Sequence, residues 1–267
     1  MTASEPSRTA DRERLAEAVR DAGAVALKFF RGTFKSWTKG TGDSPVSEAD
    51  IAVNDLLRER LPLPGDGWLS EESENDPARL GARRVWVVDP IDGTRAYIAG
   101  REDWSISAAL VEAGRPVVAA VFAPAADELF LATVGGGATR NGAPIHVSAG
   151  AGLDGARIAG PKRLLEWIAG RHPGIVAMPR VHSLALRLVR VAQGELDGAI
   201  AGGHANDWDL AAADLLVHEA GGLMATLDGK VLSYNRSEST HDVLVAAGRE
   251  RHPALIDLMR AQANQPA

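Results

Sequence analysis

The stretch VWVVDPIDGTRAY, residues 85–97, joins an apolar run to two closely spaced acids. The apolar residues 85–88 are typical of a buried strand, and the run ends directly in Asp89, with Asp92 three residues later. Burying a carboxylate without a partner is costly, so two acids at the end of such a strand indicate that something binds there.

The residues after these acids suit the binding of an anion. Gly93 lets the backbone come close to a ligand, and a helix beginning near Thr94 would point its free N–H groups at the same place. Carboxylates next to free N–H groups are suited to a metal-bound phosphate. A simple turn is the alternative for this stretch alone, because Asp, Pro and Gly are common turn formers.

Acidic residues also stand at the ends of two other apolar segments. Glu71 and Glu72 follow the short apolar run in WLSEES, and Asp209 begins the helix expected in NDWDLAAADLL. Simpler explanations exist, since Glu72 is expected to be a solvated surface residue and Asp209 could be ordinary first-turn charge on a helix. A hard cation with oxygen ligands would account for all three segments together, and two cations would do so better.

Composition excludes several classes of protein. The chain has 267 residues, of which 45% are apolar and 24% charged, as in an ordinary globular protein. Its net charge of -6 argues against binding a nucleic-acid polymer, and the lack of cysteine excludes disulfides and cysteine-ligated zinc. The N-terminus has no signal-peptide core, and no apolar run reaches the about 18 residues of a membrane span. We therefore expect a cytoplasmic protein, although the absence of cysteine would also fit the periplasm.

Motif spacing excludes other phosphate chemistries. Enzymes that form an aspartyl phosphate need acids two residues apart, and here that position is Ile91. The spacing of Asp89 and Asp92 therefore favours metals over covalent catalysis. No EF-hand, Walker, dinucleotide or HExxH zinc pattern is present, and we interpret the glycines at 135–137 as a plain turn.

The hydrophobic pattern differs between the two halves of the chain. After a frayed segment at residues 1–11, it predicts helices at 12–30 and 47–61, a loop at 39–45, and strands before Glu71 and Asp89. Three more strands are expected to form an antiparallel meander, ending in a turn-rich seam at 135–144. The second half alternates strands with helices at 164–170, 183–193, 208–220 and from Pro253. This predicts a layered α/β protein with two parts, residues 1–140 with most metal ligands and 141–267 with Asp209 and substrate contacts.

The motifs LSEES, DPIDGT and WDLAAADLLVHEAGG resemble, in this order, the three signatures of the magnesium-dependent, lithium-sensitive inositol monophosphatase-like phosphatases. The match spans residues 39–222. It implies an αβαβα sandwich, a phosphoric monoester hydrolase that forms no phosphoenzyme, a cofactor of two or three Mg²⁺ ions, and a homodimer.

The resemblance also implies a metal role for five residues. The first Mg²⁺ would be held by Glu71, Asp89 and the main-chain carbonyl of Ile91. The second would be held by Asp89, Asp92 and Asp209, and a weaker third would touch Glu71 and Asp92.

The remaining implied roles concern the phosphate and the attacking water. Gly93 and Thr94 would present backbone N–H groups to the phosphate, and Arg95 and Asp209 would also contact the substrate. The Thr94 hydroxyl, paired with Asp50, would orient and deprotonate the water. Asp50 also fits a helix capping box in SEAD, which is compatible with catalysis because both roles place it in the first turn.

Residues around these motifs bear on the choice of substrate. The sequence is most similar to the bacterial 3'(2'),5'-bisphosphate nucleotidases of sulfate assimilation, at Arg95, Tyr97, Trp104 and the pair Tyr234 and Asn235. Such an enzyme must hold a second phosphate, for which Arg95, Lys162 and Arg180 are candidates, and an adenine, for which an aromatic ring would serve. Solvated surface is the alternative for each of these basic residues.

Inositol phosphatases usually carry a sugar-binding acid seven residues before the position of Asp209, and this chain has Gly202 there. We therefore rank the nucleotidase first, inositol monophosphatase second and histidinol phosphatase third. A structural calcium site in a non-catalytic protein is the alternative of another class. Such a site would have no use for the Thr94 and Asp50 pair.

Overall fold

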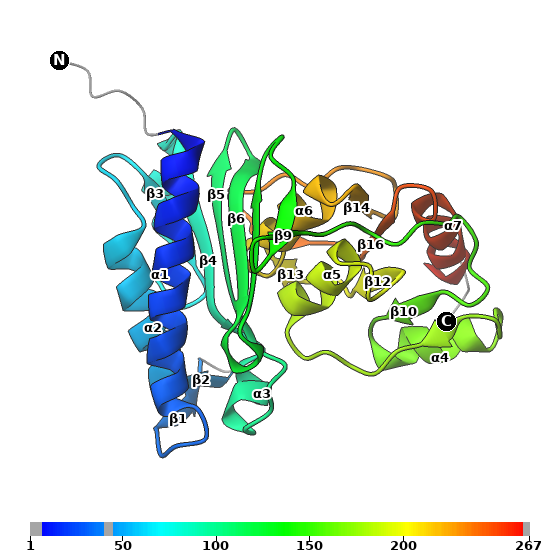
Figure 1. Cartoon of the computed structure of the whole chain (residues 1–267), viewed down its shortest axis with the longest axis horizontal. Coiled ribbons are helices and arrows are strands. Elements are labelled where there is room, and N and C mark those ends of the chain that lie inside the picture. Colours follow the sequence, from blue (N-terminus) through cyan, green and yellow to red (C-terminus); the bar gives the residue numbers. More distant parts are fainter. Residues whose placement is uncertain (1–6, 40–44, 264–267) are drawn as a thin grey trace.

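The computed structural model describes residues 7–39 and 45–263, and these are arranged in five layers (Figure 1). Two helices cover a seven-stranded sheet, two more lie between this sheet and a five-stranded sheet, and a last pair covers the outer face. The αβαβα sandwich that the resemblance implied is therefore confirmed. The expected loop at 39–45 lies largely outside the described residues.

The layers are built from seven α-helices and two longer sheets within the described ranges. The helices are α1 (Arg8–Phe29), α2 (Glu48–Arg60), α3 (Thr94–Ile98), α4 (Lys162–Ala169), α5 (Leu184–Ala192), α6 (Asp207–Glu219) and α7 (His252–Ala263). The first sheet contains β3 (Gly67–Ser70), β4 (Arg84–Asp92), β5 (Ser105–Glu112), β6 (Arg115–Ala123), β7 (Glu128–Thr133), β8 (Ala138–Arg140) and β9 (Ala143–Pro144). The second contains β10 (Arg157–Ala159), β11 (Val176–Ala177), β12 (Gly198–Ala201), β14 (Gly222–Thr226) and β16 (Leu244–Gly248). Two-stranded pairs are formed by β1 (Ser36–Thr38) with β2 (Pro45–Ser47) and by β13 (Ala205–Asn206) with β15 (Thr240–His241), and short 3₁₀ helices are η1 (Pro77–Gly81) and η2 (Pro124–Ala126).

The first helix begins earlier than the sequence suggested. Ser7 caps α1 by accepting a hydrogen bond from the backbone N–H of Ala10 at 3.2 Å. Asp11 is buried, and the guanidinium of Arg84 on β4 donates to its carboxylate at 2.9 Å. The expectation that residues 8–11 are frayed was wrong, because a cap and a buried ion pair hold this first turn in place.

The first sheet follows the order β3-β4-β5-β6-β7-β8-β9. Strand β3 runs parallel to β4, and every later pair is antiparallel, which confirms the predicted meander. Both faces of β4 are covered, since Val85 and Val87 belong to the core shared with α5 and α6, and Trp86 and Val88 to the core under α1 and α2. This explains its unbroken apolar run. Residues 135–144, expected to be turns, contain the short strands β8 and β9.

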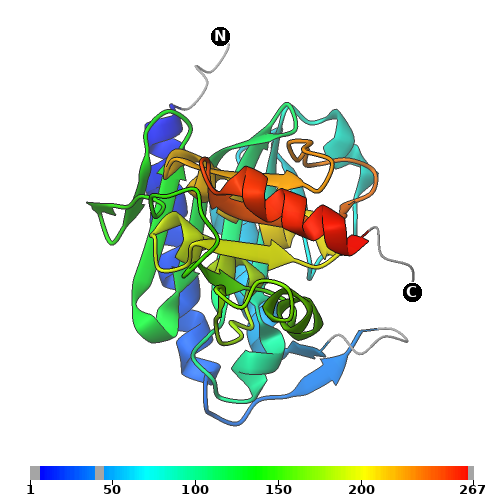
Figure 2. The same cartoon turned by 90° about the vertical axis from the view of Figure 1, so that its right-hand side faces the viewer.

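The second sheet follows the order β11-β10-β12-β16-β14. Seen from the side, α7 and α4 lie in front of its strands and cover its outer face (Figure 2). The pattern had not predicted β11, β13 or β15, which have only two residues each. No helix within residues 7–39 and 45–263 is both long and apolar enough to cross a membrane.

The middle layer joins the two sheets into one core. Helix α6 is buried on nearly all sides, packing on β5 and β6 of the first sheet, on β14 of the second and on α5. Its many alanines, including Ala211, Ala212 and Ala213, suit a helix enclosed in this way. The starts of α5 and α6 are thereby fixed against the end of β4, where the two acids of the opening motif lie.

Candidate active site

The end of β4 and the start of α6 bring three acids together. In the pairing of β4 with β5, Asp89 lies opposite Ser107 and Asp92 opposite Ser105, so β4 has one extra residue between them. This bulge turns both carboxylates to the same face of the sheet. Asp209 joins them from the first turn of α6, where it accepts a hydrogen bond from the backbone N–H of Asn206 at 2.6 Å. Carboxylate oxygens of Asp89, Asp92 and Asp209 lie within 4.8 Å of one another.

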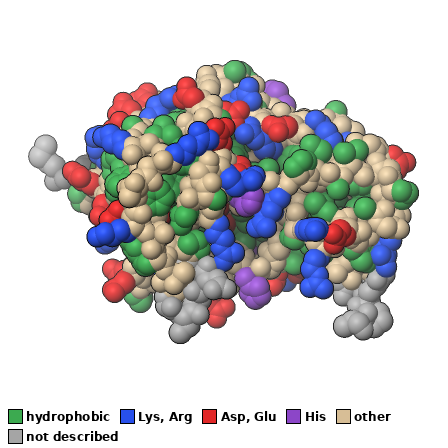
Figure 3. Space-filling view, turned by 90° about the horizontal axis from the view of Figure 1, so that it is seen from below, with side chains coloured by type: hydrophobic (Ala, Val, Ile, Leu, Met, Phe, Trp, Pro, Cys, Tyr) green, Lys and Arg blue, Asp and Glu red, His purple; other side chains and the backbone are tan. Residues whose placement is uncertain are grey.

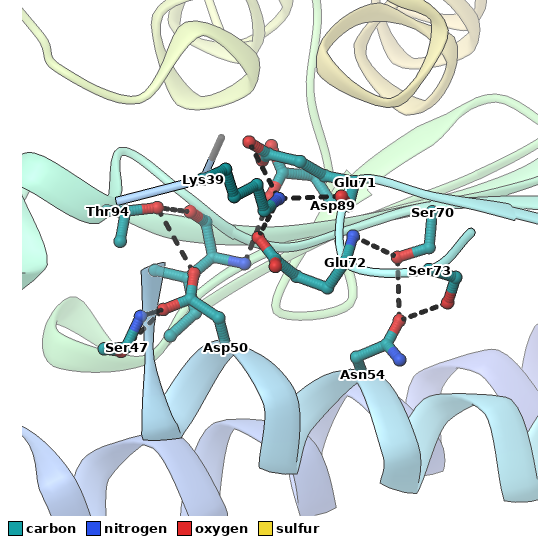
Figure 4. A network of polar contacts seen from close by, with 11 residues as sticks. Lys39, Ser47, Asp50, Asn54, Ser70, Glu71, Glu72, Ser73, Asp89 and Thr94 are labelled. Carbon is teal, nitrogen blue, oxygen red and sulfur yellow. Dashed lines mark hydrogen bonds and ion pairs between the residues drawn. The ribbon is translucent and has the colours of Figure 1, made fainter. Parts of the chain in front are cut away.

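Glu71 lies beside this three-acid group. It follows β3, and its backbone N–H extends the pairing with β4 by donating to the carbonyl of Val88 at 3.2 Å. Its charge is, after burial, the largest cause that raises the pKa of Asp89. Figure 4 shows the Glu71 and Asp89 side chains next to each other. The structure thus brings together all four acids that the sequence singled out.

The neighbouring Glu72 differs from its prediction. It was expected to be a solvated surface residue, but its side chain is only 2% exposed and lies 2.6 Å from the ammonium of Lys39. A buried carboxylate is tolerated when it is paired, and Lys39 supplies that pairing.

Lys39 makes contacts beside the acids that the sequence did not reveal. It follows β1, and its Nζ donates to the backbone carbonyl of Glu71 at 2.7 Å and to Glu72, while lying 3.7 Å from the Glu71 carboxylate (Figure 4). The contacts span more than thirty residues of sequence, so no local pattern could have predicted them. Lys39 therefore links the two-stranded pair β1–β2, which we call the β1–β2 arm, to the acids.

The acids are arranged to take up a cation. Burial is the largest cause that raises the pKa of Asp89 and Asp209 well above the usual range, and the facing carboxylates raise both further. Burial also raises the pKa of Glu71 to about 7, although the charge of Lys39 opposes this. Four clustered carboxylates with so little nearby positive charge either hold protons or bind a metal. Oxygen ligands of this kind are those that Mg²⁺ prefers, so the residues fit the expected cofactor.

Asp92 is held in place by the start of α5, a second contact that the sequence did not reveal. The hydroxyl of Ser183 and the backbone N–H of Ala185 both donate to Asp92 Oδ2 at 2.6 Å. Burial raises the pKa of Asp92, and these hydrogen bonds oppose that rise. With Oδ2 occupied in this way, Oδ1 is the oxygen that is left for a metal.

Thr94 and Asp50, which the sequence predicted to act as a pair on water, are in contact. Thr94 Oγ1 lies 3.2 Å from Asp50 Oδ1 and 3.0 Å from the carbonyl of Ile91. Asp50 is buried in the first turn of α2 and accepts from both the backbone N–H and the hydroxyl of Ser47, so the capping box is confirmed. Burial raises the pKa of Asp50 to about 6, which is suited to a base that works near neutral pH.

Gly93 shapes the turn between β4 and α3. Its φ is +92°, and an added Cβ would lie 3.1 Å from the backbone nitrogen of Ser183 and 3.3 Å from the carbonyl of Asp103. Only glycine fits both this conformation and this close packing. The hydrogen bonds of the turn begin with Ala96 and Tyr97, whose N–H groups donate to the Gly93 carbonyl.

Other residues singled out in the sequence differ in their burial. Tyr97 and Trp104 are fully buried and pack on Phe30, so neither can stack on a base. The Lys162 side chain is 87% exposed on α4 and pairs with Glu166. Arg95 and Arg180 are exposed. Tyr234 is buried and donates its hydroxyl to Asp214, and Asn235 donates its backbone N–H to Asp207. Both also bond to the first half of the chain, Tyr234 to the Gly114 carbonyl and Asn235 to Arg79.

A comparison with models of protein families shows which family this chain belongs to. The model of the inositol monophosphatase family matches residues 10–263. The chain belongs to this family. It is therefore a phosphoric monoester hydrolase that depends on metal ions, which overturns the alternative of a non-catalytic binding protein.

Relatives within the inositol monophosphatase family differ in substrate. An inositol-1-monophosphatase of Rhizobium meliloti is 38% identical over 72% of this chain and 75% of its own length. A histidinol-phosphatase of Mycobacterium tuberculosis is 38% identical over 70% of this chain and 75% of its own. A 3'-phosphoadenosine 5'-phosphate phosphatase of Mycobacterium bovis is 32% identical over 88% of each chain.

Solved structures agree on the fold. The extragenic suppressor protein suhB of Bartonella henselae superposes with a TM-score of 0.80 at 27% identity, over 95% of this chain and 98% of its own. A structure of an inositol monophosphatase/NADP phosphatase, with a TM-score of 0.82 at 22% identity over 93% of this chain and 94% of its own, contains Mg²⁺ and phosphate.

Proposed function

We propose that this phosphatase is a Mg²⁺-dependent 3'(2'),5'-bisphosphate nucleotidase that converts 3'-phosphoadenosine 5'-phosphate to AMP and phosphate. The reaction class follows from the family. The choice of substrate is our inference from residues beside the acid cluster.

We assign the metals to the acids as the motifs imply. Glu71, Asp89 and the Ile91 carbonyl would hold one Mg²⁺, and Asp89, Asp92 and Asp209 would hold a second; a third would touch Glu71 and Asp92. When bound, Mg²⁺ would supply positive charge for the phosphoryl group and lower the pKa of water.

The chain's own groups complete the reaction. Backbone N–H groups of Gly93 and Thr94 would bind phosphate oxygens, since the first turn of a helix leaves its N–H groups without intrahelical partners. The Thr94 hydroxyl would accept a hydrogen bond from the attacking water while donating its own proton towards Asp50, 3.2 Å away. Asp50, with its pKa near 6, is charged at neutral pH and could take up the proton of the water.

The observation that carries the choice of substrate is the environment of Arg187 on α5. This residue is buried, and its guanidinium donates only to the carbonyls of Val181, at 2.9 Å, and Ile200, at 3.3 Å. Its buried Nε has no hydrogen-bond partner among the residues that the structure describes. Burial and the charge of Arg180 lower the pKa of Arg187, while the charge of Asp92 raises it. A buried cation that lies close to the acid cluster and keeps one N–H group without an acceptor is suited to the second phosphate of a bisphosphate.

An inositol phosphate would instead require a carboxylate that binds the hydroxyls of the sugar ring, and this chain has none at the corresponding position. Gly202 occupies the position where inositol phosphatases usually carry that acid, and it follows Ile200, whose carbonyl Arg187 binds. Lys, Arg and His side chains also gather around the hollow between the two parts of the molecule (Figure 3). Both features favour an anionic leaving group over a neutral polyol.

The base of a nucleotide would need an exposed ring. Trp37 on β1 is 45% exposed and is the one aromatic residue among the large apolar side chains that are exposed in the described ranges. Trp37 stands two residues before Lys39, whose ammonium reaches the acids. We assign Trp37 as the surface on which adenine would stack.

Inositol monophosphatase is the second candidate, because an inositol-1-monophosphatase is 38% identical to this chain. Histidinol phosphatase is third, with a relative of equal identity over a slightly shorter stretch. Both assignments would leave Arg187 without a ligand.

The deciding experiment measures phosphate release, with Mg²⁺ and with excess EDTA, from 3'-phosphoadenosine 5'-phosphate, inositol 1-phosphate and histidinol phosphate. We expect the highest kcat/KM for the bisphosphate. Arg187→Met and Trp37→Ala should lower this value about tenfold or more while sparing inositol 1-phosphate. Arg190→Met, one turn further along α5, serves as the control. Preference of the unaltered enzyme for either of the other two esters would overturn the assignment.

A further inference from the structure

Two segments from different parts of the chain are tied together beside the acid cluster. Asp103 lies just before β5, and His182 and Ser183 lie just before α5. His182 Nδ1 is 2.6 Å from Asp103 Oδ2, and the His182 backbone N–H donates to the same oxygen at 2.9 Å. The backbone N–H of Ser183 donates to the Asp103 carbonyl at 3.1 Å. Three contacts thus converge on one residue that lies 79 positions away.

The second oxygen of Asp103 is also occupied. Arg101 donates its Nε–H to Asp103 Oδ1 at 3.0 Å, so each carboxylate oxygen has its own partner. Burial raises the pKa of Asp103, but the hydrogen bonds from His182 and Arg101 outweigh it and lower this pKa overall. Asp103 is therefore a charged acceptor. We call its three contacts with His182 and Ser183 the clasp, and the contact with the His182 ring needs an N–H at Nδ1.

The clasp fixes the residue that holds Asp92. Ser183 caps α5, donates its hydroxyl to Asp92 Oδ2 and lies 2.9 Å from the Ser105 hydroxyl. Because Gly93 packs directly against Ser183 and Asp103, the same contact also sets the turn after Asp92. If the start of α5 shifted, the Ser183 hydroxyl and the Ala185 N–H would no longer be placed to donate to Asp92 Oδ2, and the Asp92 carboxylate would lose its present orientation.

We propose that Asp103 and His182 are positioning residues for the metal site, acting through Ser183 on the orientation of Asp92. This proposal rests on the proposed role of Asp92 as a metal ligand. Removing a single group that orients a metal ligand typically weakens metal binding by 10–100-fold. The clasp also joins the first half of the chain to the second.

The test compares His182→Ala with His182→Asn. The amide nitrogen of asparagine can take the place of Nδ1 and donate to Asp103, whereas alanine cannot. Arg101→Ala is the matched control, because it removes the other partner of Asp103 and leaves the clasp. Mg²⁺ binding to the metal-free protein is measured by calorimetry, together with its melting temperature and with kcat and KM.

We expect His182→Ala to bind Mg²⁺ about 10–100-fold more weakly and to lose kcat, with His182→Asn and Arg101→Ala close to the parent. Unchanged Mg²⁺ affinity in His182→Ala, even with a lower melting temperature, would overturn the proposal. So would an Asn variant as weak as the Ala variant. These outcomes are independent of which ester the enzyme prefers. By contrast, a parent protein that binds no Mg²⁺ would refute the proposed metal site itself.

Discussion

Asp50 offers a direct test because its proposed role in the reaction opposes its effect on stability. Burial raises its pKa from 3.8 to about 6, so keeping it charged at pH 8 costs about 3 kcal/mol of folding free energy. Asp50→Asn removes this cost and retains one acceptor for the capping hydrogen bonds. The pKa of about 6 is the net result of burial and these hydrogen bonds, so their contribution is already included. We therefore expect the metal-free variant to be about 3 kcal/mol more stable at pH 8, or roughly 6–12 °C in melting temperature.

The sign of the pH dependence follows from the direction of the shift. Between about pH 4 and pH 7 the folded state binds more protons at Asp50 than the unfolded state, so the stability of the parent falls as pH rises through about 6. The advantage of the variant should grow across this window and level off above it. Its phosphate release should nevertheless drop by about 10²–10⁴-fold, because the base that takes up the proton is lost.

Thermal melting in EDTA from pH 5 to pH 8.5 and phosphate release with Mg²⁺ measure the two effects. Asp197→Asn is the matched control. Burial of Asp197 is outweighed by hydrogen bonds from Arg157 and Ser148, which lower its pKa, so this variant should be destabilised at neutral pH. An Asp50→Asn protein that melts below the parent at pH 8, or that keeps its activity, would refute the reasoning.

Three other substitutions probe the same site. Asp92→Asn should lose several powers of ten in phosphate release and most of its Mg²⁺ binding heat; full turnover in excess EDTA by the parent would contradict the metal role. Glu72→Gln should move the acid limb of kcat/KM below about pH 6, since the charge of Glu72 helps to raise the pKa of Asp50, and an unmoved limb would exclude Asp50 as its source. Gly202→Glu should be tolerated, because its added Cβ would lie 3.7 Å from Pro161, and should raise turnover of inositol 1-phosphate relative to the bisphosphate. An unchanged ratio of the two would show that this position does not select substrate.

The acids of the site could be predicted because each follows or begins an apolar segment. Glu71 and Asp89 stand at the ends of strands that run in parallel, and parallel strands bring corresponding ends to the same edge of a sheet. Asp209 was found because it stands at the start of a predicted helix. The helices α2, α5 and α6 were likewise predicted to within one or two residues, since their apolar positions recur at helical spacing.

Contacts across long separations could not be predicted. Asp92 accepts a hydrogen bond from Ser183, which lies 91 residues away. Lys39 donates to Glu72 from the β1–β2 arm, whose sequence has no apolar periodicity. The buried state of Glu72 depends on that lysine, so the local pattern suggested a surface residue. Tyr97 and Trp104 matched a substrate-related pattern, but their rings fill the space under α1.

The position of α6 between the two sheets has a consequence for how the protein can be divided. The connection from β9 to β10 is the only covalent link between the two long sheets within the described ranges, yet the core around α6 draws on both of them. A protease cut in that connection should yield a nicked enzyme whose fragments stay associated and active. Either fragment expressed alone should expose one side of this core and aggregate, so the two should recover activity only when they are folded together.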